Sequence, residues 1–115
     1  MPKNKYIDMD ITNLPTPAFI VDERLLKKNL EILKSVIDRT GCKILLAQKG
    51  FSMFYFYPLI GKYLNGTTAS SLFEARLGYE EMELKNTERK LETHIFNPSY
   101  REDEFDEIME ITNHI

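Results

Sequence analysis

The stretch Lys43-Ile-Leu-Leu-Ala-Gln-Lys49-Gly-Phe51 decides how this chain is interpreted. Its middle, Ile44 to Ala47, is a continuous apolar run, typical of a strand buried on both faces of a parallel sheet. The run then ends at a lysine, Lys49, and a glycine, Gly50. Both α/β barrels and doubly wound sheets collect their chemistry at the carboxyl ends of such strands. The stretch therefore predicts a strand that carries Lys49 at its functional end.

A lysine at this position has two interpretations. Desolvation at a semi-enclosed strand end can lower the pKa of a primary amine, which makes it a nucleophile toward carbonyl groups. Alternatively, a lysine at a strand end simply extends its ammonium group into water. The run by itself favours the second interpretation, and Gly50 adds only that the backbone can turn sharply there.

The composition narrows the class of protein. The chain has 115 residues, enough for one domain that buries roughly 65% of its unfolded surface. Fifteen Lys and Arg are scattered among eighteen acidic residues, so the net charge of −3 leaves no basic patch for nucleic acid. We found no apolar run of membrane-spanning length and no apolar secretory signal in MPKNKYIDMD. One cysteine, Cys42, builds neither a disulfide framework nor a metal site. These features predict a cytoplasmic protein with no membrane or nucleic-acid partner.

Around this stretch, short apolar segments alternate with amphipathic ones. The pattern predicts a helix from Asp22, as N-cap, to Arg39-Thr40, with Gly41 closing it. Ser71 and Glu74 fit a capping box at the start of another helix. Strands are predicted at 18–21, 44–48, 66–70 and 93–96, and helices at 22–40, 57–64, 71–78 and 102–111.

Three further assignments concern individual segments. The charged stretch from 80 to 92 is either a helical extension or a solvated loop, and the aromatic cluster at 53–57 is interpreted as core. His94 is expected to be structural, at the start of its strand, and His114 to be solvated near the terminus.

Four strands alternating with four helices predict parallel strands with right-handed crossovers. A complete (β/α) barrel needs eight such units and roughly 250 residues. The sequence reaches Asn113-His114-Ile115 without a recognisable closing element. We therefore expect residues 1–115 to be the N-terminal half of a TIM-type (β/α) barrel, with a self-contained four-stranded open sheet as the alternative.

Four segments together resemble a known family: Pro17-Ala-Phe-Ile-Val-Asp22, Leu46-Ala-Gln-Lys49-Gly-Phe, Gly66-Thr-Thr-Ala-Ser-Ser71-Leu-Phe-Glu74-Ala-Arg-Leu-Gly78 and Ile95-Phe-Asn-Pro98. They are similar to the fold-type III pyridoxal-phosphate (PLP) enzymes, the alanine racemase and ornithine decarboxylase group. Within that group the sequence looks most like the carboxynorspermidine/carboxyspermidine decarboxylases. The match runs through nearly the whole chain, in the same order and spacing.

The resemblance implies both a cofactor and a reaction. Lys49 would be the lysine that binds pyridoxal 5'-phosphate covalently, as the catalytic and cofactor-binding residue, with no metal. The reaction would be decarboxylation of carboxynorspermidine or carboxyspermidine to norspermidine or spermidine in polyamine biosynthesis, by a homodimer. The phosphate- and ring-binding residues and a β-rich second domain would lie beyond Ile115, so residues 1–115 alone would be inactive.

Two alternatives within the resemblance stay open. One is a non-catalytic PLP-binding protein of the same barrel class, and the other is a decarboxylase of another basic amino acid.

Overall fold

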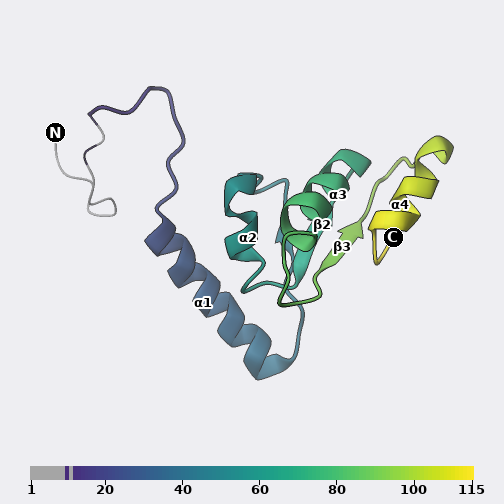
Figure 1. The fold of residues 1–115 in the computed structure, drawn as a ribbon, viewed down its shortest axis with the longest axis horizontal. Coiled ribbons are helices and arrows are strands. Elements are labelled where there is room, and N and C mark those ends of the chain that lie inside the picture. The colour runs from purple at the N-terminus through teal and green to yellow at the C-terminus, as the bar shows by residue number, and fades with distance from the viewer. Residues whose placement is uncertain (1–9, 11) are drawn as a thin grey trace.

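The computed structural model describes residue 10 and residues 12–115. Its helices and strands follow one another in the order α1, β1, α2, β2, α3, β3 and α4 (Figure 1). Their bounds are α1 Glu23–Thr40, β1 Leu46–Ala47, α2 Tyr57–Ile60, β2 Gly66–Ala69, α3 Leu72–Gly78, β3 Glu92–Ile95 and α4 Phe105–Ile111.

The three strands form one parallel sheet in the order β1-β2-β3. Leu46 pairs with Thr67, and Thr67 with Thr93, so each strand lies beside the next one along the chain. A helix lies between successive strands, as parallel pairing requires. The expected α/β class with a parallel sheet is therefore confirmed.

The strand predicted at 18–21 does not form. This segment is irregular, and the side chain of Phe19 is 99% exposed. Within the described residues the sheet contains only β1, β2 and β3, so no strand accepts the backbone hydrogen bonds of this segment. A short apolar run has strand propensity, but without a neighbouring strand it stays irregular. The prediction of four strands was therefore wrong for the first strand, at 18–21.

The C-terminal residues enter the sheet beside β3 instead. His114 forms an isolated parallel bridge with His94. The backbone N–H of Ile95 donates to the carbonyl of His114 at 2.9 Å, and that of Asn113 donates to the carbonyl of Thr93 at 2.8 Å. Residues 113–114 thus continue the parallel sheet, where the sequence offered no recognisable element.

Helix α1 has the ends that the sequence predicts. The Asp22 carboxylate accepts a hydrogen bond from the backbone N–H of Arg24 at 2.9 Å, which pairs one of the free amides of the first turn. At the other end, Gly41 has a φ of 72° and donates its N–H to the carbonyl of Ile37 at 2.8 Å. Glycine adopts this left-handed conformation without a steric penalty.

The charged stretch from 80 to 92 contains both structures that were predicted as alternatives, a helical extension and a loop. A single π-helical turn, Tyr79–Glu83, extends α3, and an irregular segment then leads to β3. Two of its apolar side chains, Met82 and Leu91, are buried. The final predicted helix is also confirmed, as a 3₁₀ turn at Glu102–Glu104 followed by α4.

The core lies on the face of the sheet that the helices cover. Successive residues of a strand point to opposite faces, so only every second residue of a strand contributes to it. Two apolar clusters fill that face. One joins α1 and α2 through Leu30, Tyr57 and Ile60, and the other joins α3, β3 and α4 through Ala75, Ile95 and neighbouring side chains. The aromatic cluster is core only in part, since Tyr57 is fully buried whereas Tyr55 is 80% exposed.

The opposite face of the sheet is less covered. Ala47 and Lys49 are exposed, and Thr68 and His94 are only half-buried. Of the described helices, none is long and apolar enough to cross a membrane.

Candidate active site at the carboxyl end of the sheet

A pocket of about 300 Å³ lies where the three parallel strands end. It is partly open to solvent. The residues that line it come from the ends of β1, β2 and β3 and from the first turn of α3. They are Ala47, Gln48, Lys49, Thr68, Ala69, Ser70, Glu74, Phe96 and Pro98.

Lys49 lies at this pocket, in the turn that follows β1. The backbone N–H groups of Gly50 and Phe51 both donate to the carbonyl of Ala47, at 3.0 and 3.3 Å, and so hold the turn closed. The lysine side chain is exposed, and it is the sole cation among the described residues that line the pocket. The sequence therefore placed Lys49 correctly at a strand end, while its chemical role stays a prediction.

The residue before the lysine is held in the core. Gln48 is only 2% exposed, and its side-chain amide donates to the carbonyl of Glu74 at 2.8 Å and to that of Thr68 at 3.4 Å. Its amide oxygen accepts the hydroxyl hydrogen of Tyr57 at 3.0 Å. Both ends of a buried amide are thus paired, as stable burial requires. This network fixes the backbone from which Lys49 projects.

Tyr57 is a neutral hydrogen-bond donor over the whole ordinary pH range. Burial raises the pKa of its hydroxyl to about 12, and the negative charge of Glu74 acts in the same direction. A phenol that keeps its proton can continue to donate to Gln48, which in turn positions the turn at Lys49.

The start of α3 forms the second wall of the pocket. The Ser71 hydroxyl accepts from the backbone N–H of Glu74 at 3.2 Å, which confirms Ser71 as N-cap. The Glu74 carboxylate, however, bonds to the backbone N–H of Ser70 at 2.7 Å and to the Ser70 hydroxyl. The Ser71 half of the predicted capping box is therefore confirmed, whereas the Glu74 carboxylate pairs with the N–H of Ser70, one residue before the N-cap.

Close approach between α3 and β2 depends on a glycine that the sequence analysis did not single out. A Cβ atom at Gly78 would lie 2.1 Å from the Thr67 hydroxyl oxygen and 3.0 Å from the Gln48 amide nitrogen. Thr67 is buried and its hydroxyl has no partner among the described residues. The glycine thus lets the helix lie directly on the residue that supports Lys49.

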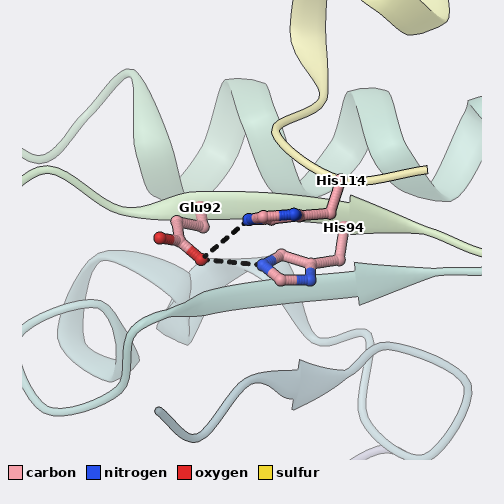
Figure 2. A group of neighbouring side chains, drawn as sticks. All are labelled: Glu92, His94 and His114. Atoms are coloured by element: carbon pink, nitrogen blue, oxygen red, sulfur yellow. Dashed lines mark hydrogen bonds and ion pairs between the residues drawn. The ribbon is translucent and has the colours of Figure 1, made fainter.

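A second group of polar side chains lies on the same uncovered face, nearer the amino ends of the strands. Glu92 and His94 from β3 meet His114 there (Figure 2). Hydrogen bonds from Lys43 and from His94 lower the pKa of the Glu92 carboxyl to about 2. His94 pairs with Glu92 and is the third residue of β3, and its structural role stays a prediction. His114 is 61% exposed at its side chain and yet stacks on His94, so the prediction of a merely solvated residue was incomplete.

Comparison with known proteins shows which proteins the chain is similar to. No protein-family model matches the chain. The chain is 40% identical over 102 residues to the carboxynorspermidine/carboxyspermidine decarboxylase of Campylobacter jejuni. The matched residues cover 89% of this chain and 25% of that protein. The crystal structure of carboxynorspermidine decarboxylase from Campylobacter jejuni, complexed with norspermidine, superposes with a TM-score of 0.79 over 89% of this chain. This chain is similar in sequence and in fold to the carboxynorspermidine decarboxylases.

Two further relatives extend the same group. The carboxyaminopropylagmatine decarboxylase of Synechocystis is 36% identical over 105 residues, 91% of this chain and 25% of that protein. The carboxynorspermidine/carboxyspermidine decarboxylase of Herminiimonas arsenicoxydans is 33% identical over 96 residues, 84% of this chain and 24% of that protein. The resemblance stated from the four sequence segments is confirmed. The chain spans about a quarter of the length of these decarboxylases.

Proposed function

We propose that this chain carries the cofactor-binding lysine of a PLP-dependent decarboxylase that acts on carboxynorspermidine or carboxyspermidine. The observation that supports it is the position of Lys49, on a pocket at the carboxyl end of a parallel sheet, in a chain 40% identical to a carboxynorspermidine decarboxylase. The products would be norspermidine or spermidine, so the protein would act in polyamine biosynthesis.

The architecture that we propose for residues 1–115 is part of the wall of a PLP-binding (β/α) barrel. The remaining barrel units and a β-rich domain would be supplied by further chain, since the relatives are about four times as long. Helices on one face and an uncovered face that carries Lys49 are what a barrel wall requires. As in the resembled family, we expect a cytoplasmic homodimer.

The pocket fits one end of the cofactor. An exposed primary amine on an open cavity can bond to an aldehyde carbon, and the pocket of about 300 Å³ leaves room for it. Besides Lys49, no pocket-lining residue that the structure describes is cationic, so groups outside this part would hold the phosphate. PLP, when bound, supplies an electron sink for the carbanion left by loss of carbon dioxide.

The residues of this chain have separable tasks in that reaction. The Nζ atom of Lys49 would anchor the cofactor. Gln48 and Tyr57 would keep the turn at Lys49 in one conformation, because both are buried and hydrogen-bonded to one another. Phe96 and Pro98, which follow β3, would form an apolar wall on the far side of the pocket.

The direct test is chemical trapping on the full-length protein. After incubation with PLP and reduction with borohydride, mass spectrometry should find the cofactor's mass on the peptide that contains Lys49. Lys43 and Lys62, both exposed, are internal controls and should stay unmodified. The variant Lys49→Arg should lose the adduct and all carbon dioxide release. Modification spread equally over the three lysines would refute the assignment of Lys49.

A second substrate has support from one comparison, the 36% identity to a carboxyaminopropylagmatine decarboxylase. Carbon dioxide release from carboxynorspermidine, carboxyspermidine and carboxyaminopropylagmatine, measured side by side as kcat/KM, separates the candidates. A protein that forms the Lys49 adduct but decarboxylates none of them, nor other basic amino acids, would be the non-catalytic PLP-binding alternative.

A further inference from the structure

The group formed by Glu92, His94 and His114 lies apart from the pocket at Lys49. The strand register puts His94 level with Thr68, and Thr68 level with Ala47, on the uncovered face. Lys49 is two residues beyond Ala47, or roughly 7 Å further along the sheet. None of the three residues of the group lines the pocket. A role for this group is therefore separate from the proposed decarboxylation.

The backbone sets the two histidines side by side. His94 and His114 are partners in a parallel bridge, so their side chains leave neighbouring strands on the same face. Hydrogen bonds on both sides of the bridge hold it, from the Ile95 N–H to the His114 carbonyl and from the Asn113 N–H to the Thr93 carbonyl. The Asn113 side chain also accepts from the Thr93 N–H at 2.7 Å. The imidazole pair is thus positioned by paired backbone and does not depend on a flexible loop.

The three side chains converge on a single point (Figure 2). The Nε2 atoms of His94 and His114 lie 2.8 and 3.9 Å from the same carboxylate oxygen, Oε2 of Glu92. All three potential donor atoms lie within 4.8 Å of one another. The other carboxylate oxygen of Glu92 is bound by Lys43, which fixes the carboxylate and leaves Oε2 toward the histidines.

This donor set is the one that borderline divalent metal ions prefer. Two imidazole nitrogens and one carboxylate oxygen suit Zn²⁺ and its neighbours, whereas Mg²⁺ and Ca²⁺ require mostly oxygen ligands. With Zn–N bonds of about 2.0–2.1 Å, tetrahedral ligands lie about 3.3 Å apart. The two distances from Glu92 Oε2, 2.8 Å to His94 Nε2 and 3.9 Å to His114 Nε2, lie on either side of that value, so each of these pairs is within about half an ångström of it.

We propose that Glu92, His94 and His114 form a binding site for one divalent transition-metal ion, with Zn²⁺ as the best-fitting ion. Three protein ligands leave the fourth position of a tetrahedral site for a water molecule. The ion would tie the segment that contains His114 to β3 and so stabilise that edge of the sheet. The ammonium group of Lys43 lies close by and opposes a second cation, which limits the affinity.

The test is a titration of the metal-free full-length protein with zinc chloride, followed by calorimetry. We expect one equivalent to bind, and excess magnesium chloride not to compete. His114→Gln and His94→Gln should each weaken binding on the order of tenfold or more, because each removes one of three ligands. Glu110→Gln, which neutralises an exposed carboxylate outside the group, is the matched control and should bind as the wild type does.

One competing zinc ligand is removed in advance. Cys42 is a free, exposed thiol, so all titrations use a Cys42→Ser background. Glutamine is polar and similar in size to histidine, so His114→Gln should leave the fold intact, which circular dichroism verifies. The proposal is overturned if no zinc binds in this background, or if His114→Gln binds zinc as tightly as the control.

Discussion

The hydrogen bond from Tyr57 to Gln48 offers the sharpest test of how the active-site turn is supported. Replacing Tyr57 with Phe keeps the ring in the core and removes only the hydroxyl group. The hydroxyl donates to the Gln48 amide oxygen at 3.0 Å, and Gln48 is 2% exposed, so water has little access to replace it. The variant thus leaves one buried acceptor without its partner.

The expected loss follows from that geometry. A buried polar group left without its partner costs about 1–3 kcal/mol. We expect Tyr57→Phe to lower the free energy of unfolding by about 2 kcal/mol. Tyr55→Phe is the matched control, because Tyr55 is 80% exposed and its replacement should change stability by less than about 0.5 kcal/mol.

The assay is urea unfolding at neutral pH, followed by circular dichroism, with a double-mutant cycle. Gln48→Met removes the amide, so Tyr57→Phe should cost about 1 kcal/mol less in that background than in the wild type. If the two substitutions are additive, or if Tyr57→Phe unfolds at the same urea concentration as Tyr55→Phe, the hydrogen bond does not support the turn as argued.

Three further predictions concern stability. The pKa of Tyr57 is raised to about 12 from 10, so the stability that this shift adds is complete below pH 10 and is lost as the pH rises toward 12. The urea midpoint should therefore fall at alkaline pH in the wild type and fall less in Tyr57→Phe. An equal dependence of the urea midpoint on pH in the two proteins would contradict this prediction. Gly78→Ala should lower the free energy of unfolding by about 1–3 kcal/mol, because its Cβ would lie 2.1 Å from the Thr67 hydroxyl oxygen. Gly50→Ala is the control, because its Cβ would meet nothing closer than 3.6 Å. Equal melting temperatures of the two variants would refute the close contact at Gly78. Ser71→Ala should lose about 1 kcal/mol in urea unfolding through loss of the helix cap, and an unchanged midpoint would contradict that role.

The parts of the fold that were predictable are those fixed by neighbours in sequence. Asp22 and Gly41 end α1 through hydrogen bonds to residues two to four positions away, so their roles can be derived from local sequence alone. Lys49 could be placed at a strand end because the apolar run before it stops abruptly. The segment at 18–21 shows the limit of this reasoning, since its apolar residues have the composition of a strand but no strand to pair with.

The support of the candidate site could not be predicted, because it depends on register. Gln48 is a polar residue beside a lysine, and only the position of α3 above it shows why it is buried. His94 and His114 are twenty positions apart, and only the parallel bridge makes them neighbours. The sequence did contain one signal for the burial of Gln48: Gly78, a glycine at the end of a helix, marks a close approach between helix and strand.

The two faces of the sheet explain why stability and chemistry should respond to different substitutions. Residues that face the helices, such as Gln48 and Thr67, are buried, so changes there act first on packing and hydrogen bonding. Residues on the uncovered face are less buried: Lys49 is exposed and His94 is half-buried. Gln48 and Lys49 are adjacent, but Gln48 is 2% exposed whereas Lys49 is exposed at the pocket. A loss of activity through Gln48 should therefore come with a loss of stability, whereas a loss through Lys49 should not.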